Sequence, residues 1–392
     1  MTLIVLFVIL FIIFVFHFLV YYFLIHAFSI ENRKIRLTLC FVLFLLSVSF
    51  IASAVIAHKW ENFLTQGFYN ISALWYGLLI NLLLVILFYW FFILIFLHLT
   101  ASVRVGVYKK IIGKALIILA LLYTVYGIYN AFFPNIKEIN VNIKNLPIEW
   151  QGKRIVHLSD IHLGRTLGKN FLERIAEKVN NINPEIVLIT GDLFDGMDGR
   201  LSSFVDLLNQ IKSKKGTYYV TGNHETYLGL EEVFAILAKT NINVLNDRVV
   251  NVDGLQIIGI SYPGNGGKDA QNIIKNDENF SLEKPSILLY HSPTNLFSFE
   301  TSSGDWHRNI YWTPDVSFSV ARNLGADLQL SGHTHRGQIF PFNFITHYIY
   351  GGYDYGLHQI EDFAIYITSG TGVWGPPVRT GGDSEIVVIT LE

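Results

Sequence analysis

Acidic, amide and imidazole side chains occur in five short clusters between residues 160 and 335 of this 392-residue chain. Each cluster directly follows a short run of β-branched and other apolar residues, so each lies where a strand is expected to end. The ends of neighbouring strands can meet at one edge of a sheet, where a rigid scaffold holds functional side chains. The side chains concerned are Asp160, His162, Asp192, Asn223, His291, His333 and His335.

The spacing and chemistry of these clusters are suited to metal binding. Asp160 and His162 are two positions apart, and the same spacing separates His333 from His335. In an extended segment, such residues project to the same side. Carboxylate, amide and imidazole donors without a thiolate favour Mn, Fe or Zn. Seven ligands exceed the needs of one ion, whereas two ions about 3.5–4 Å apart, bridged by a carboxylate and a hydroxide, would use them all. We therefore expect two divalent metal ions, with Mn²⁺ preferred over Zn²⁺ or Fe.

A glycine precedes three of the clusters, at Gly191, Gly222 and Gly332. Glycine allows the backbone to turn sharply and to approach a site closely. Taken singly, each cluster is more often explained by an ordinary turn or loop, or by a hydrogen-bonded polar pair. Five such clusters at five strand ends together predict a functional site.

The elements that must position these clusters are short strands alternating with helices. The β-branched runs extend from Arg154–Leu158 to Glu385–Thr390, and helical patterns such as Asn170–Asn180, Leu201–Lys212 and Gly229–Lys239 lie between some of them. This alternation predicts a layered α/β domain over residues 154–392. Residues 134–153 are polar and contain prolines, which indicates a linker and an edge strand.

The order of these motifs resembles the calcineurin-like metallophosphoesterases, over roughly Ile155 to Thr390. The resemblance implies a fold of two packed mixed β-sheets sandwiched by helices. Two longer strings, residues 330–338 and 370–379, are similar to a bacterial branch that often carries N-terminal membrane segments. The motifs are Asp160-x-His162, Gly191-Asp192-x-x-Asp195, Gly222-Asn223-His224-Glu225, His291 and Gly332-His333-x-His335.

The resemblance also implies how the ligands are divided, with Asp192 bridging the two ions. One ion would be held by Asp160, His162, Asp192 and His335. The other would be held by Asp192, Asn223, His291 and His333. The family's third motif commonly ends in Asp, whereas this chain has Glu225. Glu is one methylene longer, so we expect its contact, with His224 as the candidate partner, to be re-aimed while metal binding survives.

The expected reaction is hydrolysis of a phosphoester by attack of a metal-bridging hydroxide on phosphorus. Asp192 and His224 are the predicted catalytic residues, because His224 follows a ligand directly and could protonate the leaving group. Arg165 and Arg336 follow ligand clusters and are predicted to bind the phosphate through their planar donors. A turn histidine and solvated surface arginines are the plain alternatives.

The first 133 residues have the composition of a membrane domain. Apolar residues make up 51% of the whole chain and charged residues 15%, against roughly a quarter charged in soluble domains. Each of four apolar stretches reaches the roughly 20 residues that cross a hydrocarbon core about 30 Å thick. We expect an all-α transmembrane bundle of four helices over residues 1–133. The stretches are Leu3–Phe28, Ile35–Ala57, Ile71–Leu99 and Ile111–Phe133.

The connecting loops predict an orientation for this bundle. Basic residues gather in the first loop (33–36) and the third (104–114), whereas Lys59 of the second loop is offset by Glu61. The positive-inside rule places the first and third loops in the cytoplasm. The predicted location is therefore a multi-pass protein of the cell membrane, with the domain after Phe133 on the extracytoplasmic side.

Several function classes remain open. The leading one is a membrane-anchored phosphodiesterase or pyrophosphatase acting on a lipid-linked or cell-envelope substrate, with membrane lipid as its other partner. The alternatives are a phosphomonoesterase on nucleotides or phosphoproteins, a non-catalytic receptor or scaffold that keeps the metal site, and a transporter. The net charge of −2 gives no support to a nucleic-acid partner, and no protein partner can be inferred. Aromatic residues at 297–312 and 348–355 predict either a satellite hydrophobic cluster or an apolar lip facing the bilayer.

Overall fold

The computed structural model describes the chain except residues 1, 61, 100–104, 197–200, 264–268 and 297–312. The chain folds into two compact units. The membrane unit comprises Met1–Tyr129 and Gly375–Thr380, and the catalytic unit comprises Asn130–Trp374 and Gly381–Glu392. The first boundary falls four residues before the predicted one at Phe133, and the place of Gly375–Thr380 in the membrane unit has no counterpart in the sequence-based prediction.

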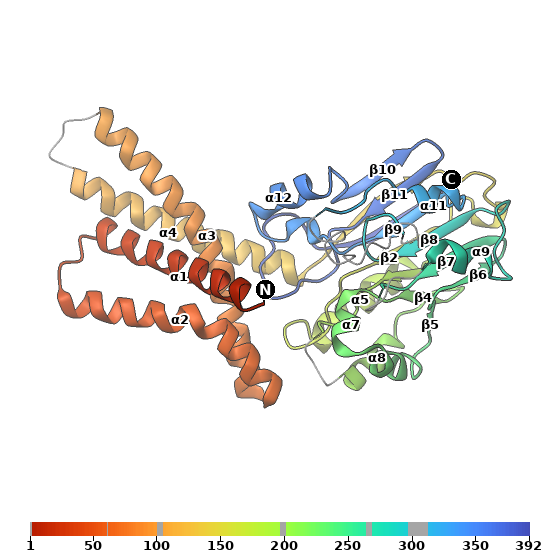
Figure 1. Ribbon diagram of the computed structural model, residues 1–392, viewed down its shortest axis with the longest axis horizontal. Coiled ribbons are helices and arrows are strands. Elements are labelled where there is room, and N and C mark those ends of the chain that lie inside the picture. The colour runs from red at the N-terminus through yellow and green to blue at the C-terminus, as the bar shows by residue number, and fades with distance from the viewer. Residues whose placement is uncertain (1, 61, 100–104, 197–200, 264–268, 297–312) are drawn as a thin grey trace. The chain divides into compact units, whose positions relative to one another are not determined.

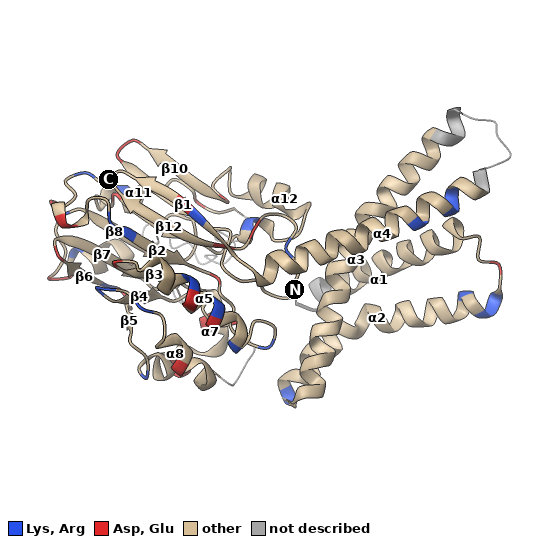
Figure 2. Ribbon diagram, turned by 180° about the vertical axis from the view of Figure 1, so that it is seen from behind, with Lys and Arg blue, Asp and Glu red and all other residues tan. Residues whose placement is uncertain are grey.

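The membrane unit contains four long apolar helices, as predicted. Each is long and apolar enough to cross a membrane, and Figure 2 shows Lys and Arg at few places along them, mostly toward helix ends. One of them, α3, begins eight residues before the predicted Ile71, because Gln66 and Asn70 interrupt the apolar run without ending the helix. The helices are α1 (Thr2–Ala27), α2 (Arg33–Lys59), α3 (Phe63–Leu99) and α4 (Val105–Phe132).

Several polar side chains inside this unit pair with one another or with the backbone. The indole N–H of Trp75 donates to Nε2 of His17 at 3.0 Å, and Nδ1 of His17 lies 2.8 Å from the carbonyl oxygen of Ile13. Asn81 donates to the hydroxyl of Thr124 at 2.9 Å. Nε2 of His17 therefore joins α1 to α3 and Nδ1 bonds within α1, which is a structural role for this buried histidine.

The segment Gly375–Thr380 packs into the membrane unit at two glycines. The N–H of Arg379 donates to the carbonyl of Gly127 at 2.9 Å. A Cβ placed on Gly127 would lie 2.7 Å from side-chain carbons of both Val378 and Thr380, and one on Gly77 would lie 2.5 Å from Val378. These distances are below van der Waals contact, so the approach of the segment to α3 and α4 requires glycine at both positions.

Two six-stranded mixed sheets form the catalytic unit, as the family resemblance implies (Figure 1). In the first, the spatial order is β1 (Asn135–Val141), β12 (Glu385–Leu391), β2 (Arg154–Leu158), β3 (Val187–Thr190), β4 (Thr217–Val220) and β5 (Ile242–Val244). In the second, it is β10 (Gly356–Ile360), β11 (Phe363–Ile367), β9 (Leu328–Ser331), β8 (Ser286–Tyr290), β7 (Leu255–Ile260) and β6 (Arg248–Val252). The strand β2 has the predicted bounds.

Apolar residues on both faces of the central strands explain the layering. Ile155 and Leu188 of the first sheet share one buried cluster with Leu289 and Leu330 of the second. A second cluster joins the outer face of the first sheet to α5, and a third joins the outer face of the second sheet to α9 and α11. Strands buried on both faces are nearly continuous runs of Val, Ile and Leu, which is why the sequence pattern found them.

Helices and short 3₁₀ segments occupy the connections. The predicted helix at 201–212 is instead a 3₁₀ turn followed by a single helical turn, and α12 lies in an aromatic-rich stretch for which no helix was predicted. The segments are η1 (Ile148–Trp150), α5 (Lys169–Ile182), η2 (Leu201–Phe204), α6 (Val205–Leu208), α7 (Asn223–Leu228), α8 (Leu230–Leu237), α9 (Ala270–Lys275), α11 (Ser319–Asn323), η4 (His335–Gly337) and α12 (Phe342–Ile349).

The first strand of the catalytic unit follows closely on the last membrane helix. Only Phe133 and Pro134 separate α4 from β1. The strand β1 pairs in parallel with β12, with Asn135 opposite Glu385. The predicted edge strand is therefore part of the sheet, and the connection between α4 and β1 is two residues long.

Candidate metal centre

The seven predicted ligands come together at the carboxyl ends of five strands. They follow β2, β3, β4, β8 and β9, which carry the five sequence clusters. All except His333 are buried, and His333 is half-buried. Functional side chains gathered at one edge of a sheet are held by the packed strands beneath them.

The backbone around the ligands is strained. Asp160, His162, Asp192, His333 and His335 have φ angles of +52°, +51°, +50°, +72° and +49°. Non-glycine residues rarely adopt this left-handed conformation, and they persist in it only where the surrounding structure fixes them. Five left-handed residues among seven candidate ligands mark a site whose geometry is imposed by the fold.

Hydrogen bonds between the ligand loops maintain this geometry. The N–H of Asp160 donates to the carbonyl of Gly191 at 3.1 Å, and that of His162 donates to the carbonyl of Asp192 at 3.0 Å. The N–H of His333 lies 3.1 Å from each carboxylate oxygen of Asp160. The loops after β2, β3 and β9 therefore hold one another in register.

Close approach of these loops depends on glycine. A Cβ on Gly332 would lie 2.1 Å from Oδ2 of Asp160, and one on Gly222 would lie 2.2 Å from Oδ1 of Asp192. Since neither distance is possible for non-bonded atoms, both positions require glycine. This is the structural reason for two of the three glycines noted in the sequence.

One group of ligand atoms comes from Asp160, His162 and His335. The Nε2 atoms of His162 and His335 lie 3.0 Å apart, and Nε2 of His335 lies 3.3 Å from Oδ1 of Asp160. Two ligand atoms each about 2.1 Å from one ion, at a right angle to each other, would be about 3.0 Å apart. The spacing of these donors therefore fits a shared divalent cation.

The second group comes from Asn223, His291 and His333. Oδ1 of Asn223 lies 3.1 Å from Nε2 of His291 and 2.9 Å from Nδ1 of His333. On the other side of its ring, Nδ1 of His291 lies 2.7 Å from the carbonyl oxygen of Thr190 and donates to it. This contact fixes the tautomer and leaves the lone pair of Nε2 directed toward the ligand cluster, as in metal-bound histidines.

Asp192 lies between the two groups. Its Oδ2 is 3.8 Å from Nε2 of His162 and 3.3 Å from Nε2 of His291. Ligand atoms that lie within 4.8 Å of one another occur in the sets Asp160–His162–His335 and Asp160–Asp192–His291. Asp192 therefore lies within reach of donors from both groups, and its role as a bridging ligand stays a prediction.

Electrostatics support a site made for cations. Burial, reinforced by neighbouring imidazoles, holds the pKa of His162 well below its usual value and lowers the pKa of His333 to about 3. Burial would also lower the pKa of His291, but the Asp192 carboxylate outweighs it and raises this pKa to about 9. Both Asp160 and Asp192 have lowered pKa values, because the imidazoles overcome the effect of burial. Two carboxylates kept ionised in a buried site attract positive charge.

The carboxylate of Glu225 bonds to backbone N–H groups, in keeping with the expectation that its contact is re-aimed. Its carboxylate accepts from the N–H groups of Asp192, Phe194 and Gly222 at 3.0, 3.1 and 2.7 Å. The extra methylene of Glu lets the carboxylate reach across to the loop after β3. Glu225 thus holds the loop that carries the bridging ligand.

His224 has the orientation needed for a proton donor. Its Nδ1 lies 2.6 Å from the carbonyl oxygen of Asp195, and its Nε2 lies 3.9 Å from Oδ2 of Asp192. Burial lowers the pKa of His224, but the Asp192 carboxylate outweighs this effect and raises it. A ring with Nδ1 donating to a carbonyl presents Nε2 to the metal cluster.

The two predicted phosphate-binding arginines differ in their surroundings. Arg165 is buried, whereas Arg336 is half-buried and has its guanidinium 4.2 Å from the centre of the Tyr355 ring. Stacking on an aromatic ring fixes a guanidinium while leaving its N–H groups for a ligand. Both arginines remain predictions as substrate ligands.

Three aromatic residues near the site were not predicted. Trp374 and Tyr227 lie with their rings 6.0 and 5.3 Å from that of His224, and the Tyr262 ring lies 6.0 Å from that of His291. Tyr262 follows the end of β7, so the strand-end signal was present in the sequence. Trp374 and Tyr227 had no such signal.

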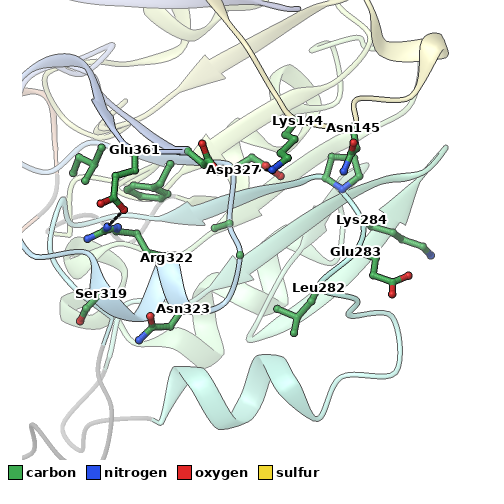
Figure 3. A pocket seen from close by; sticks show the side chains of 16 residues that line it. Lys144, Asn145, Leu282, Glu283, Lys284, Ser319, Arg322, Asn323, Asp327 and Glu361 are labelled. Atoms are coloured by element: carbon green, nitrogen blue, oxygen red, sulfur yellow. Dashed lines mark hydrogen bonds and ion pairs between the residues drawn. The ribbon is translucent and has the colours of Figure 1, made fainter.

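A hollow in the catalytic unit lies away from these ligands. A cavity of about 550 Å³ lies at the start of β8 and β9, lined by residues that include Lys144, Arg322, Glu361 and Asp362 (Figure 3). Its charges pair with each other, since Arg322 bonds to Glu361 and Lys144 lies 3.8 Å from Asp362. It is at the opposite strand ends from the metal ligands.

The model of the calcineurin-like phosphoesterase family matches residues 153–337. An uncharacterized metallophosphoesterase of Campylobacter jejuni is 33% identical over 359 residues, covering 89% of this chain and 88% of the relative. The chain belongs to the calcineurin-like metallophosphoesterase family. It is therefore a metal-dependent phosphoesterase, and the ligand cluster is the candidate for its divalent-metal centre.

Two other relatives bear on the N-terminal helices of this metallophosphoesterase. A Danio rerio transmembrane protein with metallophosphoesterase domain is 34% identical over 296 residues, covering 71% of this chain and 62% of the relative. A Helicobacter pylori (strain J99) uncharacterized metallophosphoesterase is 34% identical over 296 residues, covering 74% and 70%. Together with four apolar helices, the first of these relatives indicates a membrane protein.

Proposed function

We propose that this membrane metallophosphoesterase hydrolyses phosphodiester or pyrophosphate bonds with two metal ions, by attack of a metal-bridging hydroxide. The observation that carries the proposal is the position of Asp192 between two sets of donors, 3.8 Å from His162 and 3.3 Å from His291. A pair of ions in such a site lowers the pKa of water and neutralises charge on the phosphoryl oxygens. Mn²⁺ is the proposed metal, because the donors are oxygen and imidazole nitrogen.

The residues of the chain supply position and a proton. Asp160, Asp192 and the ligand imidazoles would hold the divalent ions, which neutralise the phosphoryl group, in buried and rigid positions. His224 would donate a proton from Nε2 to the leaving oxygen, since its Nδ1 is bonded to the Asp195 carbonyl and its Nε2 is directed toward the cluster. Arg165 and Arg336 are proposed to bind the non-reacting phosphate oxygens.

The test is a steady-state assay on bis-p-nitrophenyl phosphate with Mn²⁺ supplied, with p-nitrophenyl phosphate as the monoester comparison. We expect the diester to be the better substrate by kcat/KM, and Asp192→Asn to lose about 100-fold or more of the activity, the scale of loss when an electrostatic group at the reacting centre is removed. Equal activity in wild type and Asp192→Asn would contradict the enzyme assignment. Preference for the monoester would instead favour the phosphomonoesterase alternative.

We further propose that four spans anchor the enzyme and that the catalytic unit lies on the extracytoplasmic side. Arg33, Lys34 and Arg36 lie at the start of α2, and Lys109 and Lys110 near the start of α4, which are ends expected in the cytoplasm. Added protease should then degrade the catalytic unit in right-side-out vesicles and spare it in inverted ones. The reverse pattern would refute this orientation.

The substrate proposed for such an enzyme carries its phosphoester at the membrane surface, as a lipid or envelope component does. The support is the two-residue connection between α4 and β1, which keeps the catalytic unit next to a bilayer. We expect faster turnover of phospholipid or glycolipid phosphoesters in vesicles than of soluble nucleotides at equal bulk concentration. Equal rates would argue against a lipid-linked substrate.

A further inference from the structure

The helix α12 of the catalytic unit leaves an apolar face uncovered. None of its eight residues, all of them described, is buried. The exposed fractions are 87% for Tyr348, 62% for Phe344, 53% for Ile345 and 41% for Phe342. By contrast, α8, which has the same length, buries Val233, Ile236 and Leu237. Exposed aromatic and aliphatic side chains gathered on one short helix are unusual on a surface that meets only water.

The composition of α12 matches that of a helix at a lipid surface. It contains two Phe, one Tyr and two Ile, and no Asp, Glu, Lys or Arg. Two of its polar side chains bond locally, since Thr346 donates to the carbonyl of Phe342 and Nδ1 of His347 lies 2.8 Å from a carboxylate oxygen of Asp354. Aromatic residues of this kind are enriched at membrane interfaces, where an apolar ring meets a polar boundary.

The segment just before α12 is hydrogen-bonded to Trp374 and Gly381, the two residues on either side of the segment Gly375–Thr380. Gln338, four residues before the helix, donates to the carbonyl of Trp374 at 3.0 Å and accepts from the N–H of Trp374 at 3.3 Å. The N–H of Gly381 donates to the carbonyl of Gln338 at 2.9 Å. Trp374 and Gly381 flank the segment Gly375–Thr380, which belongs to the membrane unit. Trp374 is itself 52% exposed.

We propose that α12, with Trp374, is an interfacial element that inserts into the lipid surface of the membrane in which the protein is anchored. The occupant of the exposed face is the bilayer, because chain connections at both Phe132–Asn135 and Trp374–Gly381 keep this part of the catalytic unit within a few residues of membrane-unit helices. A helix that only rests on the surface needs an apolar face a few residues wide, which α12 provides.

The insertion of α12 has a consequence for the substrate, and this consequence rests on the proposed function. His335, a metal ligand, begins η4, which is five residues before α12. The Trp374 ring lies 6.0 Å from that of His224. An element inserted at headgroup level would therefore present the metal centre to phosphoesters of lipids that remain in the bilayer, whose phosphates lie at that level.

Insertion is tested on the full chain by site-specific fluorescence. The only cysteine, Cys40, is replaced by Ser, and a bimane label is attached to a cysteine at Phe344 or Tyr348. The matched control is a label at Ile148 in η1, an apolar residue that is 77% exposed and precedes β2, at the opposite strand ends from the metal site. The protein is reconstituted in phosphatidylcholine–phosphatidylglycerol vesicles with doxyl-labelled lipid or with iodide on both sides.

We expect labels at Phe344 and Tyr348 to be quenched by doxyl lipid at least twofold more than the label at Ile148, and to be protected from iodide. Iodide quenching as strong as at Ile148 would overturn the proposal, because it would show α12 in water. Protection from both quenchers would also overturn it, because it would show α12 packed against protein.

A second readout separates lipid docking from the chemical step. The double variant Phe344→Glu/Tyr348→Glu is compared with Ile148→Glu on a dioleoylphosphatidyl-p-nitrophenol ester in vesicles and on soluble bis-p-nitrophenyl phosphate. We expect at least a fivefold loss on the lipid ester, little change on the soluble ester, and no loss on either for Ile148→Glu. Equal rates of the double variant and wild type on both esters would contradict docking. If wild type hydrolyses neither ester, the proposed function fails, while the quenching result still decides where α12 lies.

Discussion

The Nε2 atoms of His162 and His335 face each other at 3.0 Å, although the residues are 173 positions apart in the chain. Two imidazoles cannot both present an N–H at this distance without repulsion, and a single hydrogen between them would be one neutral hydrogen bond. With a divalent cation between the rings, both lone pairs are used. The pairing therefore couples the stability of the catalytic unit to metal binding.

Removal of metal should lower the thermal stability of the protein. A ligand that binds only the folded state stabilises it by about 2.7 kcal/mol at 100 times its dissociation constant. We expect the unfolding temperature to fall in EDTA and to recover when Mn²⁺ is added back, as measured by differential scanning fluorimetry in detergent. His335→Ala should lose most of this shift, whereas His358→Ala, a substitution on β10 outside the ligand set, should keep it. An equal EDTA effect in both variants would mean that the metal acts elsewhere.

A second prediction concerns the glycine in front of the last ligand pair. In Gly332→Ala the new Cβ would lie 2.1 Å from Oδ2 of Asp160, so the loop or the carboxylate must move. A displacement of about 1 Å at a catalytic group can cost 100-fold in rate. We expect that loss in kcat for bis-p-nitrophenyl phosphate, together with less than two Mn per chain by mass spectrometry.

The matched control for this substitution is Gly168→Ala. Nothing lies within 4 Å of a Cβ at Gly168, and its φ of −93° is open to any residue. This variant should retain metal content and activity. If Gly332→Ala behaves like Gly168→Ala, the close approach of the loops after β2 and β9 is not needed for function.

Metal binding should depend on pH through His291. Its pKa is raised to about 9, so without metal the ring carries a proton below that pH and must lose it to bind. The apparent affinity for the second ion should therefore rise as pH increases toward 9, by up to tenfold per unit, and level off above it. Calorimetry at pH 7.5 in buffers of different ionisation enthalpy should detect about one proton released. Asp192→Asn removes the carboxylate that raises this pKa, and should reduce the proton release.

The strands and the ligands could be predicted because their signals are local. A strand buried on both faces is a continuous apolar run in the sequence. The first and last residues of β2 are therefore those of the predicted run, Arg154–Leu158. Each ligand cluster also lies next to its strand in sequence. The contact of Glu225 with three backbone N–H groups could not be predicted, because it depends on the distance between two loops. The same holds for Gly375–Thr380, whose place in the membrane unit depends on helices more than 240 residues earlier in the chain.

Glu225 should contribute to stability through these backbone contacts. Hydrogen bonds to a charged group contribute about 1.5–3 kcal/mol, and leaving buried donors unsatisfied costs a similar amount. Glu225→Gln places an NH₂ group near N–H donors, so we expect a loss of about 2–3 kcal/mol in unfolding free energy and a lower metal content. Denaturation of the metal-free protein separates the two effects. Glu232→Gln on the exposed face of α8 should change neither, and a loss in both variants would point to a general effect of lost charge.

The packing of Gly375–Thr380 in the membrane unit can be tested with two glycines on the same helix. A Cβ on Gly77 would lie 2.5 Å from Val378, whereas one on Gly67 meets nothing within 4 Å. Both glycines are in α3, so Ala at either site gains about 1 kcal/mol of helix propensity, and their difference isolates the contact. Overpacking costs about 1–3 kcal/mol, and we therefore expect Gly67→Ala to be neutral or stabilising and Gly77→Ala to lower the unfolding temperature in detergent.

Since Trp374 adjoins this segment and lies beside His224, Gly77→Ala should also change kcat/KM while leaving the Mn content at two per chain. Equal stability and activity in the two variants would show that Val378 moves aside freely and that the segment places no constraint on Trp374.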